Sequence, residues 1–481
     1  LLMAACSQPQ PDGDFVSWVD PKIGTGGHGH VFVGANVPFG MVQVGPTSIP
    51  QSWDWCSGYH ESDSTVIGFS HTHLSGTGIG DLFDVTLMPV VGEVAYARGT
   101  EEDPQSGLWS YADRSKEVAV PGYYSVPLTR YGVTAEMTAT SRVGLHRYTF
   151  PEADDAAVVF DLENGGCWDK ATDTGLKAEG DRIVTGWRHS AGWAADQKVF
   201  FAAEFSRPFD SFEPVGDRYG RASFRTKAGE RILVKVALSP VSVEGARANL
   251  AAELPGWDFE ATAAAASARW NDELSRIRIE TADRTARKIF YTALYHTMIA
   301  PVTFCDVDGS YRGADGEVHP DPGYTTYSVF SLWDTYRAKM PLLTLVEPER
   351  MADIVSTMLA IADEQGRLPV WHLWGNETDC MVGNPGIVVV ADAIVKNIPG
   401  VDRERRTAMN EGRGNGLRMK YGYIPCDLFN EAVAYDLEYA LADGAAALAA
   451  RALGKKTEEY LASRSRSYRH LFDPSTGFMR G

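Results

Sequence analysis

Five of the chain's eleven histidines lie within residues 20–88, together with Trp53, Trp55 and twelve glycines. Imidazole rings donate and accept hydrogen bonds, and indole rings offer flat stacking faces. Glycine adopts backbone conformations closed to other residues and lets a ligand approach the chain closely. The segment therefore predicts the wall of a binding site for a small polar ligand, carried on loops between short strands.

Three motifs divide this segment. GTGGHGH (24–30) is glycine-rich, but it lacks the lysine and the following helix of a phosphate-binding loop. SWDWCSGYH (52–60) predicts either a stacking and hydrogen-bonding site or an aromatic side chain packed under a loop. GFSHTHLSGTG (68–78) resembles a metal pair only superficially, because no third ligand follows at helical spacing. Structural hydrogen bonding is the alternative for its histidines.

Two motifs in the second half of the chain could also bind a ligand. SLWDTYRAK (331–339) places Asp334 at a helix start, where it could cap the helix or, beside Trp and Arg, grip sugar hydroxyls. LPVWHLWGNETDCMVGNPG (368–386) places Trp374 and Glu377 in a glycine-bounded loop ahead of a helix. Binding and catalytic residues concentrate on such loops. An exposed tryptophan is unfavourable in water unless a ligand covers it, so these residues favour a binding site here.

Composition narrows the class of partner. The formal net charge of -18 argues against nucleic acid, which needs an excess of Lys and Arg, and is compatible with a neutral ligand or a cation. The sequence contains no run of 18 or more apolar residues, so it predicts no transmembrane helix. Twelve Trp and 20 Tyr suit a carbohydrate-handling surface, although aromatic residues also fill cores.

The first residues, LLMAACSQPQPDGDF, resemble the end of a bacterial lipoprotein signal with Cys6 as the lipidated residue. We expect an exported lipoprotein, in the periplasm or at the outer-membrane surface of a Gram-negative bacterium, with a lipid anchor as its only membrane attachment. A chance Ala-Ala-Cys is the alternative. The other five cysteines show no CxxC spacing and form no disulfide framework.

The spacing of apolar runs predicts a multidomain β + α protein. Short strands separated by turn residues recur from residue 14 to about 253, which is typical of a β-sandwich. Residues 259–277 predict a linker helix, and the chain from Asp283 onward predicts six or seven helices. The expected boundaries are 1–13 for a signal remnant and tether, 14–255 for the sandwich, 256–282 for the linker and 283–481 for a helical domain.

Several long strings together resemble glycoside hydrolase family 92, the calcium-dependent exo-α-mannosidases abundant in gut Bacteroidetes. They are VDPKIGTGGHGHVFVGANVPFGMVQVGP, WDWCSGYH, GFSHTHLSGTG, FYTALYHTMIAP, SLWDTYRA, NETDCMVG, LEYALAD and YRHLFDPSTGFMRG. The resemblance implies an N-terminal β-sandwich, a helical linker and an (α/α)6 barrel. It also implies inverting hydrolysis of terminal α-mannosides from N-glycans or mannan, with Ca2+ on the mannose 2- and 3-hydroxyls, where hard oxygen ligands fit calcium.

The resemblance also implies where the site residues lie. On the sandwich side the substrate-binding candidates are Trp53, Asp54, Cys56 and His71, and on the barrel side they are Asp334, Trp374 and Glu377. The family's catalytic acid, base and main calcium motif are expected beyond Gly481. The chain is then expected to hold about half of the barrel and, alone, to lack the proton-transfer pair. Linkage preference is left open, because GNPG (383–386) departs from the family's pattern.

Three other functions stay open. A helical-barrel glycoside phosphorylase shares the two-domain plan, although the acidic net charge weighs against it. A carbohydrate-binding fragment without hydrolysis would result if the acid and base are absent. An amidase of the peptide N-glycanase type needs a nucleophile, and only Cys56, near His60, suggests one.

Overall fold

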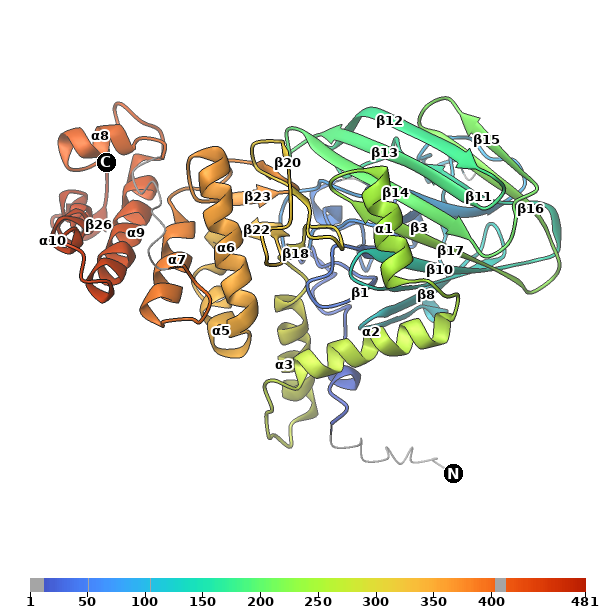
Figure 1. Ribbon diagram of the computed structural model, residues 1–481, viewed down its shortest axis with the longest axis horizontal. Helices are drawn as coiled ribbons and strands as arrows, with labels where there is room; N and C mark the ends of the chain where they lie inside the picture. Colours follow the sequence, from blue (N-terminus) through green and yellow to red (C-terminus); the bar gives the residue numbers. More distant parts are fainter. Residues whose placement is uncertain (1–12, 51, 104, 403–411) are drawn as a thin grey trace. The chain divides into compact units, whose positions relative to one another are not determined.

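The computed structural model describes residues 13–50, 52–103, 105–402 and 412–481, which form two compact units. The first unit extends to Trp193 and continues over Val199–Ala300, and the second comprises Ala194–Lys198 and Pro301–Gly481. Figure 1 labels the elements, with strands dominating the first unit and helices the second. This confirms the predicted order of a β domain followed by a helical domain. The lipidation prediction at Cys6 lies outside the described residues.

Two antiparallel sheets form the sandwich of the first unit. The seven-stranded sheet has the order β1 (Ala35–Asn36), β2 (Gln43–Thr47), β4 (Gly68–Ser70), β5 (Thr86–Val91), β11 (Ala153–Asp161), β16 (Tyr219–Thr226) and β15 (Ser211–Val215). The eight-stranded sheet has the order β12 (Lys170–Glu179), β13 (Ile183–Ala191), β14 (Gln197–Phe205), β17 (Glu230–Ser239), β10 (Val143–Phe150), β9 (Val133–Ala139), β8 (Tyr123–Leu128) and β7 (Val118–Val120). A separate pair joins β3 (Thr65–Val66) to β6 (Ser110–Tyr111).

The core lies between the two sheets. Phe160 on β11 stacks on Phe201 on β14 with ring centroids 6.0 Å apart, and both rings are fully buried. Because successive side chains of a strand point to opposite faces, the other face of the eight-stranded sheet needs its own cover. Val143 and Leu145 of β10 pack there against Leu254 and Phe259 of the helical segment that follows β17.

Three helices complete the first unit: α1 (Val243–Glu253), α2 (Phe259–Leu274) and α3 (Arg284–Thr297). Each begins at a side-chain cap, since Ser242, Asp258 and Asp283 accept hydrogen bonds from backbone amides of the first turn. The prediction of β structure up to about residue 253 is therefore wrong for α1, where Ser242 at the N-cap outweighs the preceding β pattern. The predicted boundaries at 255 and 282 remain predictions.

Seven α-helices lie in the described part of the second unit. They are α4 (Leu332–Thr335), α5 (Lys339–Val346), α6 (Pro348–Gln365), α7 (Pro385–Val395), α8 (Asn415–Tyr421), α9 (Ala432–Ala452) and α10 (Glu458–Arg464). Helix α9 packs against both α7 and α10. The single helix expected from SLWDTYRAK onward is divided in two, because Ala338 leaves the helical region with φ -139°.

Short strands lie before α4 and between α6 and α7, where the sequence pattern predicts only helix. They are β18 (Val302–Thr303) with β21 (Tyr327–Ser328), β19 (Tyr311–Arg312) with β20 (Val318–His319), and β22 (Phe330–Ser331) with β23 (Trp371–Leu373) and β24 (Asn376–Glu377). A last hairpin pairs β25 (Phe472–Asp473) with β26 (Phe478–Met479). Two-residue strands are too short for a period-2 pattern to reveal them.

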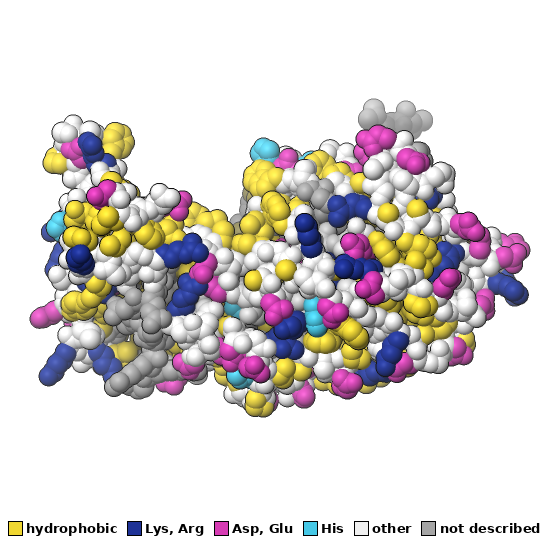
Figure 2. Space-filling view, turned by 90° about the horizontal axis from the view of Figure 1, so that it is seen from above, with side chains coloured by type: hydrophobic (Ala, Val, Ile, Leu, Met, Phe, Trp, Pro, Cys, Tyr) yellow, Lys and Arg dark blue, Asp and Glu magenta, His cyan; other side chains and the backbone are white. Residues whose placement is uncertain are grey.

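Four 3-10 helices are also present, at Val16–Trp18 (η1), Trp53–Trp55 (η2), Arg114–Lys116 (η3) and Ser467–His470 (η4). None of the described helices is both long and apolar enough to cross a membrane. Acidic and basic side chains are mixed over the face shown in Figure 2.

Candidate sugar-binding site

Asp54 is the centre of a polar cluster on the loops of the first unit. It lies on η2, and its Oδ1 is 2.6 Å from Nδ1 of His28 and 3.6 Å from Nε2 of His30. Both histidines come from the glycine-rich loop 24–30, where Gly27 and His30 have positive φ. The His28 side chain is 73% exposed, whereas His30 is buried. One carboxylate thus joins two loops at the surface.

The charge states of this cluster follow from its surroundings. The hydrogen bond from His28 is the main cause that lowers the pKa of Asp54 below its ordinary value. Burial lowers the pKa of His30, although Asp54 opposes that shift. At neutral pH the cluster therefore presents an ionised carboxylate beside a neutral, buried imidazole, and a carboxylate accepts hydrogen bonds from hydroxyl groups.

Trp53 stands beside this carboxylate with 49% of its surface exposed. Its indole Nε1 donates to Gly78 O at 2.8 Å, and the His30 ring packs edge-on against it with centroids 4.3 Å apart. These contacts fix the ring while leaving much of it open to solvent. An exposed aromatic face next to a carboxylate is the combination expected for a sugar, which has both apolar C–H faces and hydroxyl groups.

Cys56 lies under this surface and is fully buried. Its thiol donates to Trp53 O at 2.6 Å and contacts the Cys167 thiol. Hydrogen bonding with Cys167, together with burial, raises the pKa of Cys56. The nearby His60 already hydrogen bonds to Ser62 and to Gly27 O. A buried thiol that holds its proton is a poor nucleophile, which counts against the amidase alternative.

His71 lies in the sandwich core, and both of its ring nitrogens are occupied. Nδ1 donates to Val85 O at 2.5 Å, and Nε2 lies 2.9 Å from His146 Nε2. Since Val85 O can only accept, His71 Nε2 must accept from His146, whose Nδ1 then accepts from the Tyr148 hydroxyl at 2.8 Å. Burial lowers the pKa of His71 to about 4. This geometry supports structural hydrogen bonding, the alternative considered for the motif.

Asp334 lies exposed on α4 of the second unit, where it accepts from Ser331 Oγ at 2.6 Å. Arg337, one turn later, lies over the rings of Trp333 and Tyr336 at 4.6 and 4.4 Å. Its Nη2 also pairs with Glu438 Oε1 at 2.8 Å. The acidic and guanidinium groups on this turn of α4 are hydrogen-bonding groups of the kind that sugar hydroxyls need.

Glu438 on α9 is a member of this cluster that the sequence reasoning did not assign. Its Oε2 accepts from the Tyr336 hydroxyl at 2.9 Å while Oε1 pairs with Arg337. The available signal was its place in the LEYALAD string of the family pattern. Pairing across a hundred residues, however, leaves no local trace in a sequence.

Glu377 is turned toward its own backbone. Its carboxylate accepts from the amides of Val370, Trp371 and Asp379 at 2.8, 2.9 and 3.1 Å. Burial raises its pKa, although these three bonds oppose that shift. The side chain therefore fixes the backbone at the start of β23 and just after β24, and any role at a ligand would be exerted through that shape.

Trp374 is buried, contrary to the expectation of exposed tryptophans in this loop. Only 2% of its surface is accessible, and its ring packs edge-on against Phe304 at 5.3 Å. Its φ of 46° is held by a hydrogen bond from its backbone N to Ser328 Oγ at 2.8 Å. Packing under the hairpin explains this tryptophan without a ligand. Its role in substrate binding stays a prediction.

Among the residues that the structure describes, no group of three or more His, Cys, Asp or Glu side chains is placed to hold a metal ion. Calcium takes carbonyl, amide and water oxygens as well as carboxylates, so calcium binding stays a prediction of the family resemblance.

Two family models match nearly the whole chain. The glycosyl hydrolase family 92 N-terminal domain matches residues 18–239, and the family 92 catalytic domain matches residues 245–481. The chain belongs to glycosyl hydrolase family 92. Because the catalytic-domain match covers 245–481, the expectation that this family 92 chain lacks the catalytic acid and base is not borne out.

Solved structures of family 92 enzymes from Bacteroides thetaiotaomicron are similar to this chain. The α-mannosidase BT3965, solved with mannoimidazole, is 40% identical with a TM-score of 0.94, over 97% of this chain and 65% of its own. The inverting mannosidase BT2199 is 28% identical with a TM-score of 0.86, over 98% of this chain and 67% of its own.

Another relative comes from a fungus. It is an uncharacterized secreted glycosidase of Arthroderma benhamiae, 24% identical over 536 residues, which cover 98% of this chain and 64% of the relative. The chain thus spans 64–67% of the length of these three relatives.

Proposed function

We propose that this family 92 protein is an exo-acting α-mannosidase that hydrolyses terminal α-mannosides of N-glycans or mannan, with inversion and in a calcium-dependent manner. The observation that carries the proposal is the 40% identity, over 97% of this chain, to an α-mannosidase solved with mannoimidazole. That relative is named for its action on mannose, and the similarity extends over both units of this chain.

The surface chemistry of each unit supports a sugar as the ligand. The first unit offers the exposed Trp53 ring beside the Asp54 carboxylate, and the second offers Asp334 one turn from the stacked guanidinium of Arg337. A flat apolar face and fixed hydrogen-bonding groups are what a pyranose ring needs. Neither cluster carries the excess of cations that a phosphorylated ligand would need.

We propose inversion because the family 92 relative BT2199 is described as an inverting mannosidase. An inverting enzyme separates its acid and base by about 6.5–9.5 Å, so that a water molecule fits between the base and the anomeric carbon. Proton NMR of an α-mannoside digest tests this part, because inversion makes β-mannose appear first. Initial release of α-mannose would contradict it.

Calcium dependence rests on the resemblance to the family alone. Calcium takes six to eight oxygen ligands, and when bound it would polarise and orient sugar hydroxyls. The test is removal of the ion with a chelator, followed by its return. Full activity in the chelator would contradict the proposal, as would rescue by magnesium as strong as rescue by calcium.

Export of the protein as a lipoprotein is likewise proposed. The Ala-Ala-Cys6 sequence supports it, and a fungal relative is described as secreted. Lipidation is tested by labelling cells with radioactive palmitate, with a Cys6→Ser variant for comparison. An unlabelled wild-type protein would contradict lipidation.

The decisive experiment for the proposed activity is an assay of the purified chain on aryl α-mannoside, aryl β-mannoside and aryl α-glucoside. We expect turnover of the α-mannoside only. Mannose binding without turnover would favour a carbohydrate-binding protein, which is the alternative that the same surface chemistry supports. Phosphate-dependent release of mannose 1-phosphate would favour a phosphorylase.

A further inference from the structure

Two cysteines on separate loops of the first unit lie in contact. Cys56 follows η2 directly, and Cys167 lies in the loop between β11 and β12. Their thiols hydrogen bond with each other, and neither is in a disulfide. Both sulfurs also meet the same turn of backbone, since Cys56 Sγ donates to Trp53 O at 2.6 Å and Cys167 Sγ lies 3.9 Å from Ser52 O. The fold thus brings together two thiols that are far apart in the sequence.

The backbone on both sides of Cys167 is fixed to the segment before β5. Gly166 N donates to Leu82 O at 3.0 Å, and Trp168 N donates to Gly80 O at 3.3 Å. A side chain at Gly80 would collide with Cys167 Sγ, so this glycine leaves the space that the sulfur fills. The position of the Cys167 sulfur is therefore set by its surroundings.

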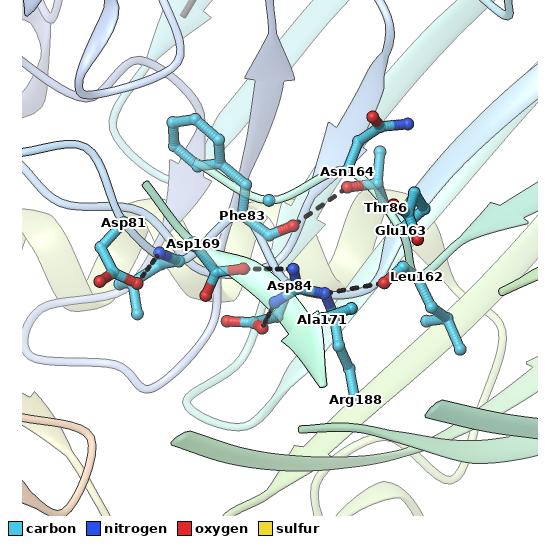
Figure 3. A network of polar contacts seen from close by, with 12 residues as sticks. Asp81, Phe83, Asp84, Thr86, Leu162, Glu163, Asn164, Asp169, Ala171 and Arg188 are labelled. Carbon is cyan, nitrogen blue, oxygen red and sulfur yellow. Dashed lines mark hydrogen bonds and ion pairs between the residues drawn. The ribbon is translucent and has the colours of Figure 1, made fainter. Parts of the chain in front are cut away.

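A buried ion network anchors the end of the same loop. Figure 3 shows Arg188 between Asp84 and Asp169, with its Nε donating to Leu162 O. The Arg188 Nη1 lies 2.7 Å from Asp84 Oδ1, and all three charged side chains are buried. Because Asp169 is only two residues after Cys167, this network restrains the loop and keeps the two thiols in contact.

The two thiols differ in their surroundings. Cys56 is fully buried, whereas Cys167 is partly exposed. Hydrogen bonding with Cys56 is the main cause that lowers the pKa of Cys167, although burial opposes that shift. The same contact, together with burial, raises the pKa of Cys56. Since the thiolate is the reactive form, Cys167 is the sulfur that can attack a reagent from solvent. Cys56 can react only with a group already bound to Cys167.

We propose that Cys167 and Cys56 are a redox modification site, which forms a reversible disulfide by exchange with a small-molecule disulfide such as oxidised glutathione. The Cys167 thiolate attacks one sulfur of the reagent, and one glutathione thiolate leaves with the electron pair of the broken bond. The Cys56 thiol then gives its proton to a glutathione thiolate and attacks Cys167 Sγ, which displaces the second glutathione. Two protein thiols are oxidised, and one glutathione disulfide is reduced to two thiols.

The bond would join η2 to the loop after β11 and close a long stretch of chain. Such a closure removes conformational freedom from the unfolded state, so the oxidised first unit should be more stable than the reduced one. The inference does not depend on the proposed mannosidase activity. It agrees with the proposed export, because disulfides persist in oxidising compartments outside the cytosol.

The test treats the reduced, intact chain with oxidised glutathione under native conditions. Remaining thiols are then blocked, and the digested protein is analysed by mass spectrometry. We expect two fewer free thiols per chain and a linked peptide that joins Cys56 to Cys167. In Cys56→Ser the reaction should stop with glutathione on Cys167. In Cys167→Ser the buried Cys56 should stay unmodified.

Cys380→Ser is the matched control, because Cys380 is partly exposed like Cys167 and lies in the second unit. It should form the same link as wild type. Oxidised wild type should also unfold at a higher urea concentration than reduced wild type, and dithiothreitol should reverse the shift. The proposal is overturned if wild type forms no link between Cys56 and Cys167, or keeps glutathione on Cys167. Equal urea midpoints of the two forms would also overturn it.

Discussion

Nδ1 of His28 lies 2.6 Å from Oδ1 of Asp54, so an exposed imidazole and a carboxylate from two separate loops form one polar group. The pair stands beside the exposed ring of Trp53, whose indole N–H is already engaged with Gly78 O. What this surface presents to a ligand is therefore an aromatic face and a charged acceptor, both held in place. That combination links the fold of the first unit to the sugar proposed as its ligand.

Replacement of His28 should raise the pKa of Asp54. The hydrogen bond from His28 is the main cause of its lowered value, so His28→Ala should return the carboxyl toward the ordinary range. The stabilisation exists above the ordinary pKa of an aspartate and is lost as pH falls through the lowered folded-state value. Carboxyl carbon NMR measures both values. Lys116→Ala, which removes the partner of Asp113, should leave Asp54 unchanged.

Loss of Arg188 should destabilise the first unit severely. Arg188→Met leaves Asp84 and Asp169 buried without their cation, which costs about 3–5 kcal/mol of unfolding free energy. Urea denaturation measures the loss. Exposed Arg182 provides the control, and Arg182→Met should change the free energy by less than about 0.5 kcal/mol.

The triple variant Arg188→Met with Asp84→Asn and Asp169→Asn sharpens this test. It removes the unpaired charges, so it should recover part of the stability lost in Arg188→Met. A triple variant less stable than the single one would show that the buried charges are not the source of the loss.

Acid should destabilise the sandwich through its buried histidines. Burial lowers the pKa of His71 to about 4 and that of His73 to about 3, while an unfolded histidine titrates near 6.5. Between these values the unfolded chain binds protons that the folded chain does not, so stability falls as pH drops from about 6.5 toward 4. For His71 alone, the full shift corresponds to about 3 kcal/mol.

Measurement of the unfolding free energy from pH 4 to pH 8 checks this. His146→Gln removes one buried titrating ring and should flatten the slope below pH 6.5. His28→Ala removes an exposed ring and should leave the slope unchanged. A wild-type curve that is level between pH 4 and 6.5 would contradict the neutral chain His71–His146–Tyr148.

Glu377→Gln separates a structural role from contact with substrate. One amide oxygen cannot replace two carboxylate oxygens that accept from Val370, Trp371 and Asp379, so a buried N–H loses its partner at a cost of about 1–3 kcal/mol. Hydrogen exchange should show faster loss of these three amides. Glu349→Gln, at an exposed position of α6, is the control. Unchanged exchange with weakened sugar binding would instead place Glu377 at the ligand.

The sequence predicts the sheets and most helices because their signals are local. The apolar alternation of 143–150 and the capped start at Asp283 both have counterparts in the structure. The roles of His71, Trp374 and Arg188 were not predictable in this way. Each depends on partners far along the chain, such as His146 for His71 and Phe304 for Trp374.

Titration of methyl α-mannoside into the intact chain tests the central claim, that the Trp53–Asp54 surface binds mannose. We predict that wild type binds methyl α-mannoside more tightly than methyl α-glucoside. Asp54→Asn, which keeps the shape but loses the charged acceptor, should bind about tenfold more weakly, whereas Asp113→Asn should bind as wild type. Equal affinity of Asp54→Asn and wild type, or no binding by wild type, would contradict the account.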